Sequence, residues 1–130
     1  MAPLPVRGGL TALAVLALGV RGFCAAEAGA QEPREATVMY VYALDQPAVL
    51  MPEAMAHDAY AVLACESRHD PNARNGVSGA TGLFQLHPIH ARRAQAMGYR
   101  WEQIVEPQAN VDVATAIWRE QGWSPWACKP

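Results

Sequence analysis

Two stretches of the chain repeat apolar residues at the spacing of one helix face. The first begins at Pro52, which suits the first position of a helix, and Glu53 suits the positive end of the helix dipole. Its stripe ends in a carboxylate and consists of Met55, Ala59, Val62, Leu63 and Glu66. We therefore predict a helix that buries this stripe and places Glu66 in its last turn.

The second stretch runs from Pro107 to Gln121, with Gly122 as its stop. Asn110 lies at the head of a stripe formed by Val113, Ala114, Ile117 and Trp118. An amide on a buried stripe needs hydrogen-bond partners. Between the two stretches we predict a helix over residues 88–97 and one more turn over residues 101–105.

The remaining segments carry turn signals or no pattern. Asp70-Pro71-Asn72, Asn75-Gly76 and Ser78-Gly79 leave room only for a tight loop or a very small hairpin. Residues 82–85 are expected to start a short helical turn. Residues 31–51 show no sustained period, and we expect an irregular N-terminal arm with one short extended piece. No internal repeat is present, so we expect one domain over residues 52–130.

The chain has 130 residues, and its first thirty have the features of an export signal. Arg7 precedes an apolar run from Leu10 to Val20, and Ala28 and Ala30 are the small residues before a cleavage point. The run is shorter than the roughly 20 residues that a membrane span needs. We predict a signal peptide over residues 1–30, a secreted or periplasmic protein, and no stable membrane anchor after cleavage. An uncleaved anchor is the alternative.

The chain has three cysteines. Cys24 leaves with the signal, and Cys65 and Cys128 remain as a pair in an oxidising compartment, so we predict that they form a disulfide. Closing a loop of roughly 60 residues would stabilise the fold by about 4 kcal/mol in the chain-entropy model. The alternatives are two buried free thiols and, for Cys24, a lipid anchor, although the residues before Cys24 are unlike a lipoprotein signal.

The net charge of −2 at pH 7 disfavours nucleic acid as a partner, because the chain lacks the basic stripe that phosphate groups require. His69, His87 and His90, with Asp70, match no metal-ligand spacing. We therefore expect neither a metal site nor a cofactor.

Glu66 is the main candidate for chemistry. The negative end of the helix dipole and the apolar stripe both disfavour its charged form. Such a carboxyl can hold a proton and donate it to a leaving oxygen, which is the role of the general acid in glycoside cleavage. The alternative is a surface glutamate that forms an ion pair with Arg68 or Arg119.

The residues after Glu66 could form a binding surface. The loop over residues 78–82 has little side-chain bulk, so its backbone could approach a sugar closely, although it could equally be an ordinary turn. Gln85 is a polar residue among apolar neighbours, and we expect either a satisfied core amide or a ligand-facing one. Indole rings stack on sugars or pack in cores, and four are present: Trp101, Trp118, Trp123 and Trp126.

Four short motifs in order resemble the soluble lytic transglycosylase domain of the lysozyme-like superfamily over about residues 52–126. They are Glu66-Ser67, Asp70-Pro71, Ser78-Gly79-Ala80 and Gly82-Leu83-Phe84-Gln85. Asn110-Val111 is similar to the Asn-Ile that opens a later helix in that family, whereas the family's Ala-Tyr-Asn motif is missing. The two ends of this region, residues 65–67 and 121–128, resemble the resuscitation-promoting factors, whose ends a disulfide joins.

The resemblance implies an α+β, mainly α, small lysozyme-like domain with a minimal or absent β-hairpin. It implies a lytic transglycosylase whose partner is the glycan of peptidoglycan, cut at the β-1,4 bond between N-acetylmuramic acid and N-acetylglucosamine. Glu66 would act as acid and then as base, the substrate's acetamido group would assist, and a 1,6-anhydro product would form. The alternatives are a hydrolytic muramidase and a non-catalytic peptidoglycan-binding module.

The resemblance also implies roles for individual residues. Asp70 is expected to be structural, because Asp-Pro often begins a turn. We expect a monomer in which the substrate contacts come from Ser78, Gly79, Ala80, Gln85, Asn110 and Trp123.

Overall fold

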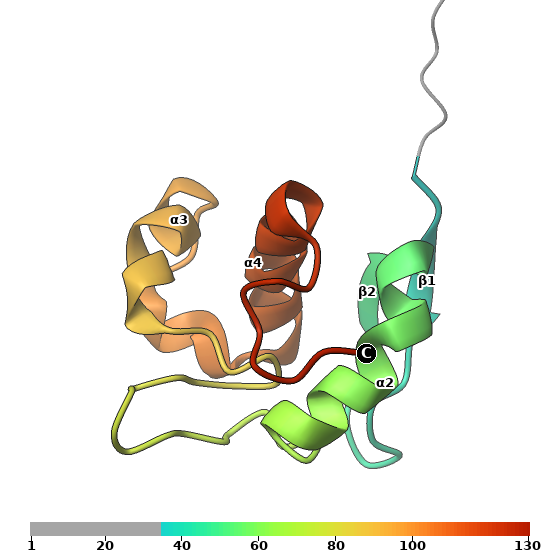
Figure 1. Cartoon of the computed structure of the whole chain (residues 1–130), viewed down its shortest axis with the longest axis horizontal. Coiled ribbons are helices and arrows are strands. Elements are labelled where there is room, and N and C mark those ends of the chain that lie inside the picture. The colour runs from blue at the N-terminus through green and yellow to red at the C-terminus, as the bar shows by residue number, and fades with distance from the viewer. Residues whose placement is uncertain (1–34) are drawn as a thin grey trace, which may run out of the picture. The chain divides into compact units, whose positions relative to one another are not determined.

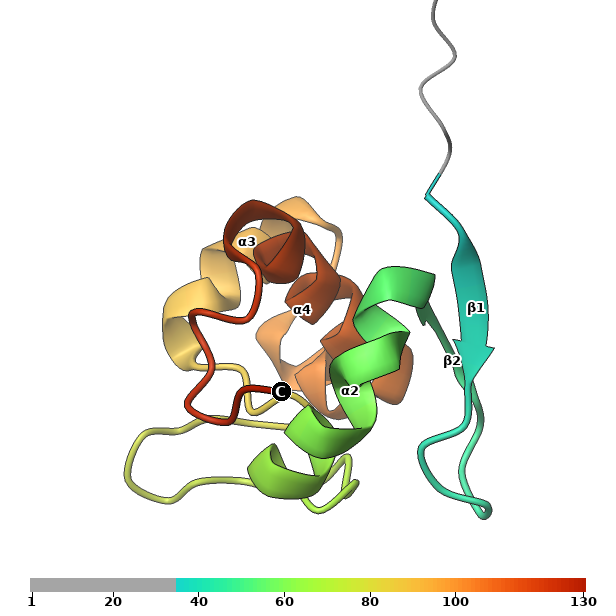
Figure 2. The ribbon, with the colours of Figure 1, turned by 45° about the vertical axis from the view of Figure 1, so that its right-hand side comes forward.

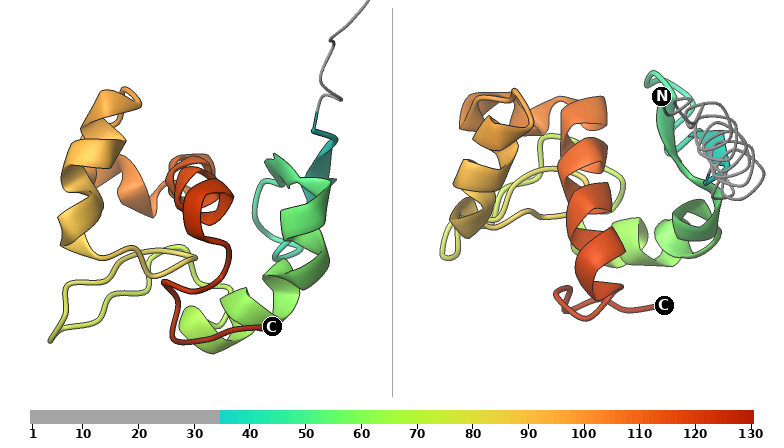
Figure 3. Two further views of the ribbon diagram at one scale, coloured as in Figure 1. Left: turned by 45° about the horizontal axis from the view of Figure 1, so that its top comes forward. Right: turned by 90° about the horizontal axis from the view of Figure 1, so that it is seen from above.

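The computed structural model describes residues 35–130, and the predicted signal peptide lies outside the described residues. Two strands come first, β1 (Thr37–Tyr40) and β2 (Val49–Pro52), and helix α2 (Glu53–Glu66) follows β2 directly. After a long loop come the 3₁₀ turn η1 (Pro88–His90), helix α3 (Ala91–Ala96), the 3₁₀ turn η2 (Trp101–Val105) and helix α4 (Pro107–Gln121). Figure 1 shows α4 between α3 and α2, and the two views of Figure 3 agree.

The N-terminal arm is more regular than the sequence indicated. Strands β1 and β2 pair antiparallel, with Thr37 opposite Pro52 and Tyr40 opposite Val49 (Figure 2). Val49 and Met51 are buried while Leu50 between them is exposed. A strand of four residues repeats the alternation of buried and exposed positions only twice. This is too few repeats to predict a strand from the sequence pattern. The expectation of an irregular arm was therefore wrong for residues 37–40 and 49–52.

Helix α2 confirms the predicted stripe, since Met55, Ala59, Val62 and Leu63 are all fully buried. Pro52 is the residue before the helix rather than its first residue. The helix ends at Glu66, where the N–H and the hydroxyl of Ser67 both donate to the carbonyl of Leu63. Arg68 and His69 then have positive φ values of 55° and 60°, so the helix does not continue.

The loop between α2 and η1 folds back on itself. Thr81 forms isolated bridges with Arg74 on one side and with Leu86 on the other. Residues 82–85 form a turn rather than the start of a helix, and Gln85 has a positive φ of 47°. Gly82 is required in this turn: its φ is 83°, and a Cβ there would lie 2.1 Å from the side-chain nitrogen of Asn110.

The helix predicted over residues 88–97 is divided into η1 and α3. The N–H groups of His90 and Ala91 bond to carbonyls three residues back, which is the tighter 3₁₀ pattern. Helix α4 has the predicted ends, and Gly122 follows it with a φ of 59°. The predicted turn over residues 101–105 is η2.

The C-terminal tail closes the core. Trp126 is buried and its indole N–H donates to the carbonyl of Phe84 at 2.9 Å. The structure contains the predicted disulfide between Cys65 and Cys128, which are 63 residues apart. It ties the tail to the last turn of α2, and the C-terminus lies beside that helix in Figure 2. In the part of the chain that the structure describes, no helix is long and apolar enough to cross a membrane.

Candidate active site

Glu66 is half-buried at the end of α2. Its Oε1 accepts a hydrogen bond of 3.1 Å from the backbone N–H of Cys128, which the disulfide to Cys65 keeps beside the helix. Within residues 35–130 no ion pair reaches this carboxyl. Arg119 binds Glu35 instead, with its Nε 2.9 Å from a carboxylate oxygen. The alternative of a glutamate paired with Arg68 or Arg119 was therefore wrong.

The loop before Gln85 is held by Asn75. The Asn75 side-chain oxygen accepts from the N–H groups of Val77 and Ser78, and its backbone carbonyl accepts from Gly79. The hydroxyl oxygen of Ser78 accepts from the N–H of Ala80 at 3.2 Å. The N–H groups of residues 78–80 are thus bonded inside the loop, and an approach of this backbone to a sugar stays a prediction. What remains for a ligand is the hydroxyl proton and the carbonyl of Ser78, which is exposed.

Gln85 combines the two roles that the sequence left open. Its Nε2 donates to the carbonyls of Ala73 and Gly82, each at 3.0 Å, which fixes the side chain against the loop. Its Oε1 accepts no hydrogen bond within the described part of the chain and remains as an acceptor. Gln85 and His90 also line a small cavity of about 60 Å³. Burial, with the nearby Arg93 and His87, lowers the pKa of His90, so its ring is neutral at pH 7.

Asn110 lies in the core, and a contact with substrate stays a prediction. The residue is fully buried, and its Oδ1 accepts from the N–H of Phe84 at 2.8 Å. Its Nδ2 donates to the carbonyls of Thr81 and Ile104 at 3.0 and 2.9 Å. The side chain therefore joins α4, η2 and the loop that carries Gln85, and it has no capacity left for a ligand except one lone pair.

Trp123 is half-buried and belongs to an aromatic cluster. Its ring centroid lies 6.2 Å from Phe84, 6.3 Å from Trp118 and 5.3 Å from Trp126. These contacts hold the indole in place at the edge of the core. A stacking role for its exposed part stays a prediction.

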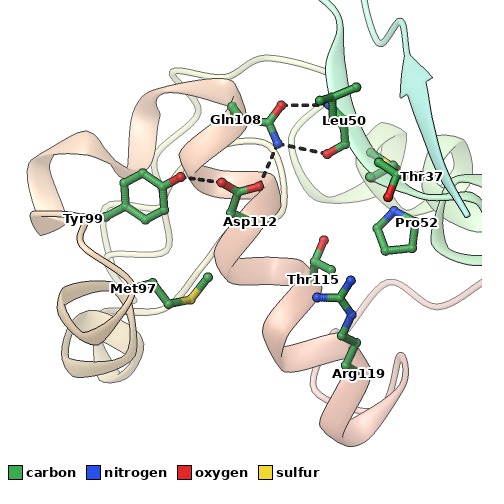
Figure 4. A pocket seen from close by; sticks show the side chains of 10 residues that line it. Thr37, Leu50, Pro52, Met97, Tyr99, Gln108, Asp112, Thr115 and Arg119 are labelled. Atoms are coloured by element: carbon green, nitrogen blue, oxygen red, sulfur yellow. Dashed lines mark hydrogen bonds between the residues drawn. The ribbon is translucent and has the colours of Figure 1, made fainter. Parts of the chain in front are cut away.

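The larger cavity lies elsewhere, at the other end of α2 (Figure 4). It measures about 430 Å³ and is bordered by β2, α4 and the turn after α3. Gln108 there bonds to both backbone groups of Leu50, at 2.8 and 2.9 Å, and to Asp112 at 2.7 Å. Asp112 also accepts from the hydroxyl of Tyr99, and this bond raises the pKa of Tyr99 to about 12. These groups are paired with one another, so the network fastens β2 to α4.

No group of three or more His, Cys, Asp or Glu side chains within residues 35–130 is arranged to hold a metal ion. The candidate groups on α2 and in the loop that follows it are the carboxyl of Glu66, the amide oxygen of Gln85 and the hydroxyl of Ser78. The sequence indicated all three residues, but it gave no sign of the contact from the Cys128 amide. That contact depends on how the C-terminal tail folds back to α2, which no local sequence pattern indicates.

A mainly α domain with a two-stranded sheet and a half-buried glutamate at a helix end has the architecture of a small lysozyme-like enzyme, as the sequence predicted. The sequence model of the transglycosylase SLT domain matches residues 46–121, and the chain belongs to this family. It is accordingly a lytic transglycosylase, a glycan-cleaving lyase that acts on peptidoglycan. Comparisons with curated proteins and with solved structures gave no match.

Proposed function

We propose that Glu66 is the acid and base of an exported enzyme that cuts the β-1,4 bond between N-acetylmuramic acid and N-acetylglucosamine and leaves 1,6-anhydro ends. The observation that carries this proposal is the environment of Glu66. The carboxyl is half-buried at the negative end of α2, where it accepts the backbone N–H of Cys128 and, within residues 35–130, forms no ion pair.

The reaction needs a single carboxyl. The protonated Glu66 gives its proton to the bridging oxygen as the bond from that oxygen to C1 of the muramic acid breaks. The oxygen of the sugar's own acetamido group supports the positive charge at C1. The Glu66 carboxylate then removes the proton of the 6-hydroxyl, whose oxygen bonds to C1, and no water is consumed.

Asp70 is the nearest other carboxylate in the sequence, and a two-carboxylate mechanism would need such a partner. Its Oδ1 accepts the N–H of Asn72 at 2.8 Å and so closes the turn after α2. This local bond supports a structural role for Asp70 and a single-carboxyl mechanism.

The remaining polar groups fit an acetamido sugar. The free Oε1 of Gln85 can accept the acetamido N–H, and the Ser78 hydroxyl can donate to a sugar oxygen. The half-buried Trp123 offers an apolar surface for a sugar ring. Because Oε1 of Glu66 is bound to the Cys128 amide, Oε2 is the oxygen that carries the transferred proton in this scheme.

The products test the proposal. Purified chain without residues 1–30 is incubated with peptidoglycan, and the soluble fragments are weighed by mass spectrometry. We expect muropeptides lighter by one water than the reducing forms. Reducing ends alone would identify a hydrolytic muramidase and contradict the proposal.

Export has its own measurement. Expression of the full chain in a bacterial host should release a protein whose N-terminal residue is Gln31. A full-length chain that stays with the cells would reject the predicted signal peptide.

A further inference from the structure

A second cavity, of about 270 Å³, lies between α3 and η2, away from the end of α2 that carries Glu66. Helix α4 separates α3 from α2 in Figures 1 and 3. The lining combines two cations, one amide and two aromatic rings, and consists of Ala91, Arg92, Gln95, Tyr99, Arg100 and Trp101.

The two guanidinium groups are uncompensated. Arg92 and Arg100 are exposed, and within residues 35–130 neither forms an ion pair. The adjacent Arg93 differs, because both of its terminal nitrogens bind the carboxylate of Glu120, at 2.7 and 2.6 Å. Of two neighbouring arginines, one therefore holds α3 to α4 and the other faces a cavity without a counter-charge.

The wall of this cavity is held in place by other contacts. The Tyr99 hydroxyl is bound to Asp112, and the backbone N–H of Arg100 donates to the side chain of Gln103 at 2.8 Å. Tyr99 and Trp101 are half-buried, so each ring has one part in the protein and one part toward solvent. A fixed aromatic surface beside two cations requires little ordering when a ligand binds.

The larger cavity of Figure 4 makes a useful contrast. Its Gln108, Asp112 and Tyr99 bond to one another and to β2, and its Arg119 is already paired with Glu35. The cavity beside α3 is smaller, but its charged groups have no partner in the described part of the chain. Two guanidinium groups that have no counter-charge in the described residues and border a cavity can bind an anionic group there.

We propose that the cavity beside α3 is an accessory site that binds a carboxylate-bearing sugar of the peptidoglycan strand, outside the cleavage site. Guanidinium groups bind carboxylates with charge-assisted hydrogen bonds, and the aromatic rings stack on the sugar face. The volume is just below the roughly 300–1,000 Å³ of typical small-molecule sites, which suits one sugar unit. The choice of ligand rests on the proposed substrate, but the site does not depend on Glu66.

Two sources of the carboxylate exist in the wall: the lactyl group of muramic acid when no peptide is attached, and the peptide stem when it is. Titrations would use Glu66→Gln protein and three probes: neutral N-acetylglucosamine oligomers, wall glycan stripped of peptide, and glycan that keeps its peptides. The signal of the Trp101 indole N–H in nuclear magnetic resonance spectra reports binding at this cavity directly.

We expect Arg92→Gln and Arg100→Gln each to weaken binding of the carboxylate-bearing probes by roughly tenfold, with neutral oligomers unaffected. The matched control is Arg119→Gln, which removes the same charge at a residue outside this cavity and should leave affinity unchanged. If the glycan without peptides binds more tightly, the lactyl group is the source of the carboxylate. If the glycan with peptides binds more tightly, the peptide stem is the source.

The proposal is overturned if both substitutions leave affinity unchanged, if they weaken neutral and charged probes equally, or if the Trp101 signal does not move. These outcomes are independent of the cleavage chemistry. Failure of the product-mass experiment would reject the proposed 1,6-anhydro reaction but leave these affinities interpretable.

Discussion

The two ends of α2 differ in what their polar groups are bonded to. At the amino end, Gln108, Asp112 and Tyr99 are satisfied by one another and by the backbone of Leu50, although they border the larger cavity. At the carboxyl end, Glu66 and Gln85 each keep an oxygen that accepts no hydrogen bond within residues 35–130. The proposed chemistry is therefore assigned to the end with unused hydrogen-bonding capacity rather than to the end with the larger cavity.

The strongest way to break this comparison is Glu66→Gln. The amide keeps the shape and can still accept the Cys128 N–H, but it cannot donate a proton as the carboxylic acid does. We expect release of muropeptides to fall by at least 10²–10⁴-fold with an unchanged melting temperature. The matched control is Asp70→Asn, which removes a carboxylate four residues away and keeps the oxygen that accepts from Asn72. Equal losses in the two variants would contradict the assignment of Glu66.

The disulfide links the C-terminal tail to the carboxyl end of α2 and has no counterpart at the amino end of this helix within the described residues. Replacing Cys65 and Cys128 together by Ala removes the covalent link and frees the amide that contacts Glu66. We expect the free energy of unfolding, measured in urea, to fall by about 4 kcal/mol, and the rate of cleavage to fall as well. Reduction of the unaltered protein should give the same two effects. A double variant with full stability would show that the tail is held by Trp126 and its neighbours alone.

Asn110→Ala tests whether this amide belongs to the scaffold. The change leaves the carbonyls of Thr81 and Ile104 and the N–H of Phe84 without their partner in the core. We expect a loss of about 3 kcal/mol in the free energy of unfolding. KM at a temperature where the variant is folded should stay near the original value. A raised KM with an unchanged free energy of unfolding would show that Asn110 contributes to substrate binding rather than to the fold.

The smallest expected effect is at the amino end of α2, in Tyr99→Phe. The pKa of Tyr99 is raised to about 12, so the folded state keeps a proton that the unfolded state loses near pH 10. Its contribution to stability is complete below pH 10 and is lost as the pH rises from about 10 to 12. Denaturation curves across this range should fall more steeply for the original protein than for the variant. Parallel curves would mean that the bond to Asp112 adds no stability.

The sequence predicted α2, α4 and η2 well, because long apolar stripes were bounded by Pro or Gly. The sequence did not predict β1 and β2, because a strand of four residues shows too little alternation of apolar and polar positions. It predicted η1 and α3 as one helix, because 3₁₀ and α helices favour the same residue types. It made Glu66 and Gln85 candidates because both are polar residues beside apolar runs, and their roles stay predictions.

The sequence could not show which polar groups would satisfy one another. Asn110 turns inward to backbone groups that include Phe84 and Thr81, which are distant in sequence. The bonds of Asn75 to Val77 and Ser78 are local and are of the kind that Asn often forms in turns. One local signal for Asn110 was present, since Gly82 marks a place where something must approach the backbone closely.

The link between Cys65 and Cys128 also sets an order of events. The amide that steadies Glu66 is carried by the third residue from the chain's end, and it is fixed there by a bond that thiol-rich cytosol does not allow to persist. With the export and the role of Glu66 that we propose, the hydrogen bond from Cys128 would form only after the chain has left the cytosol.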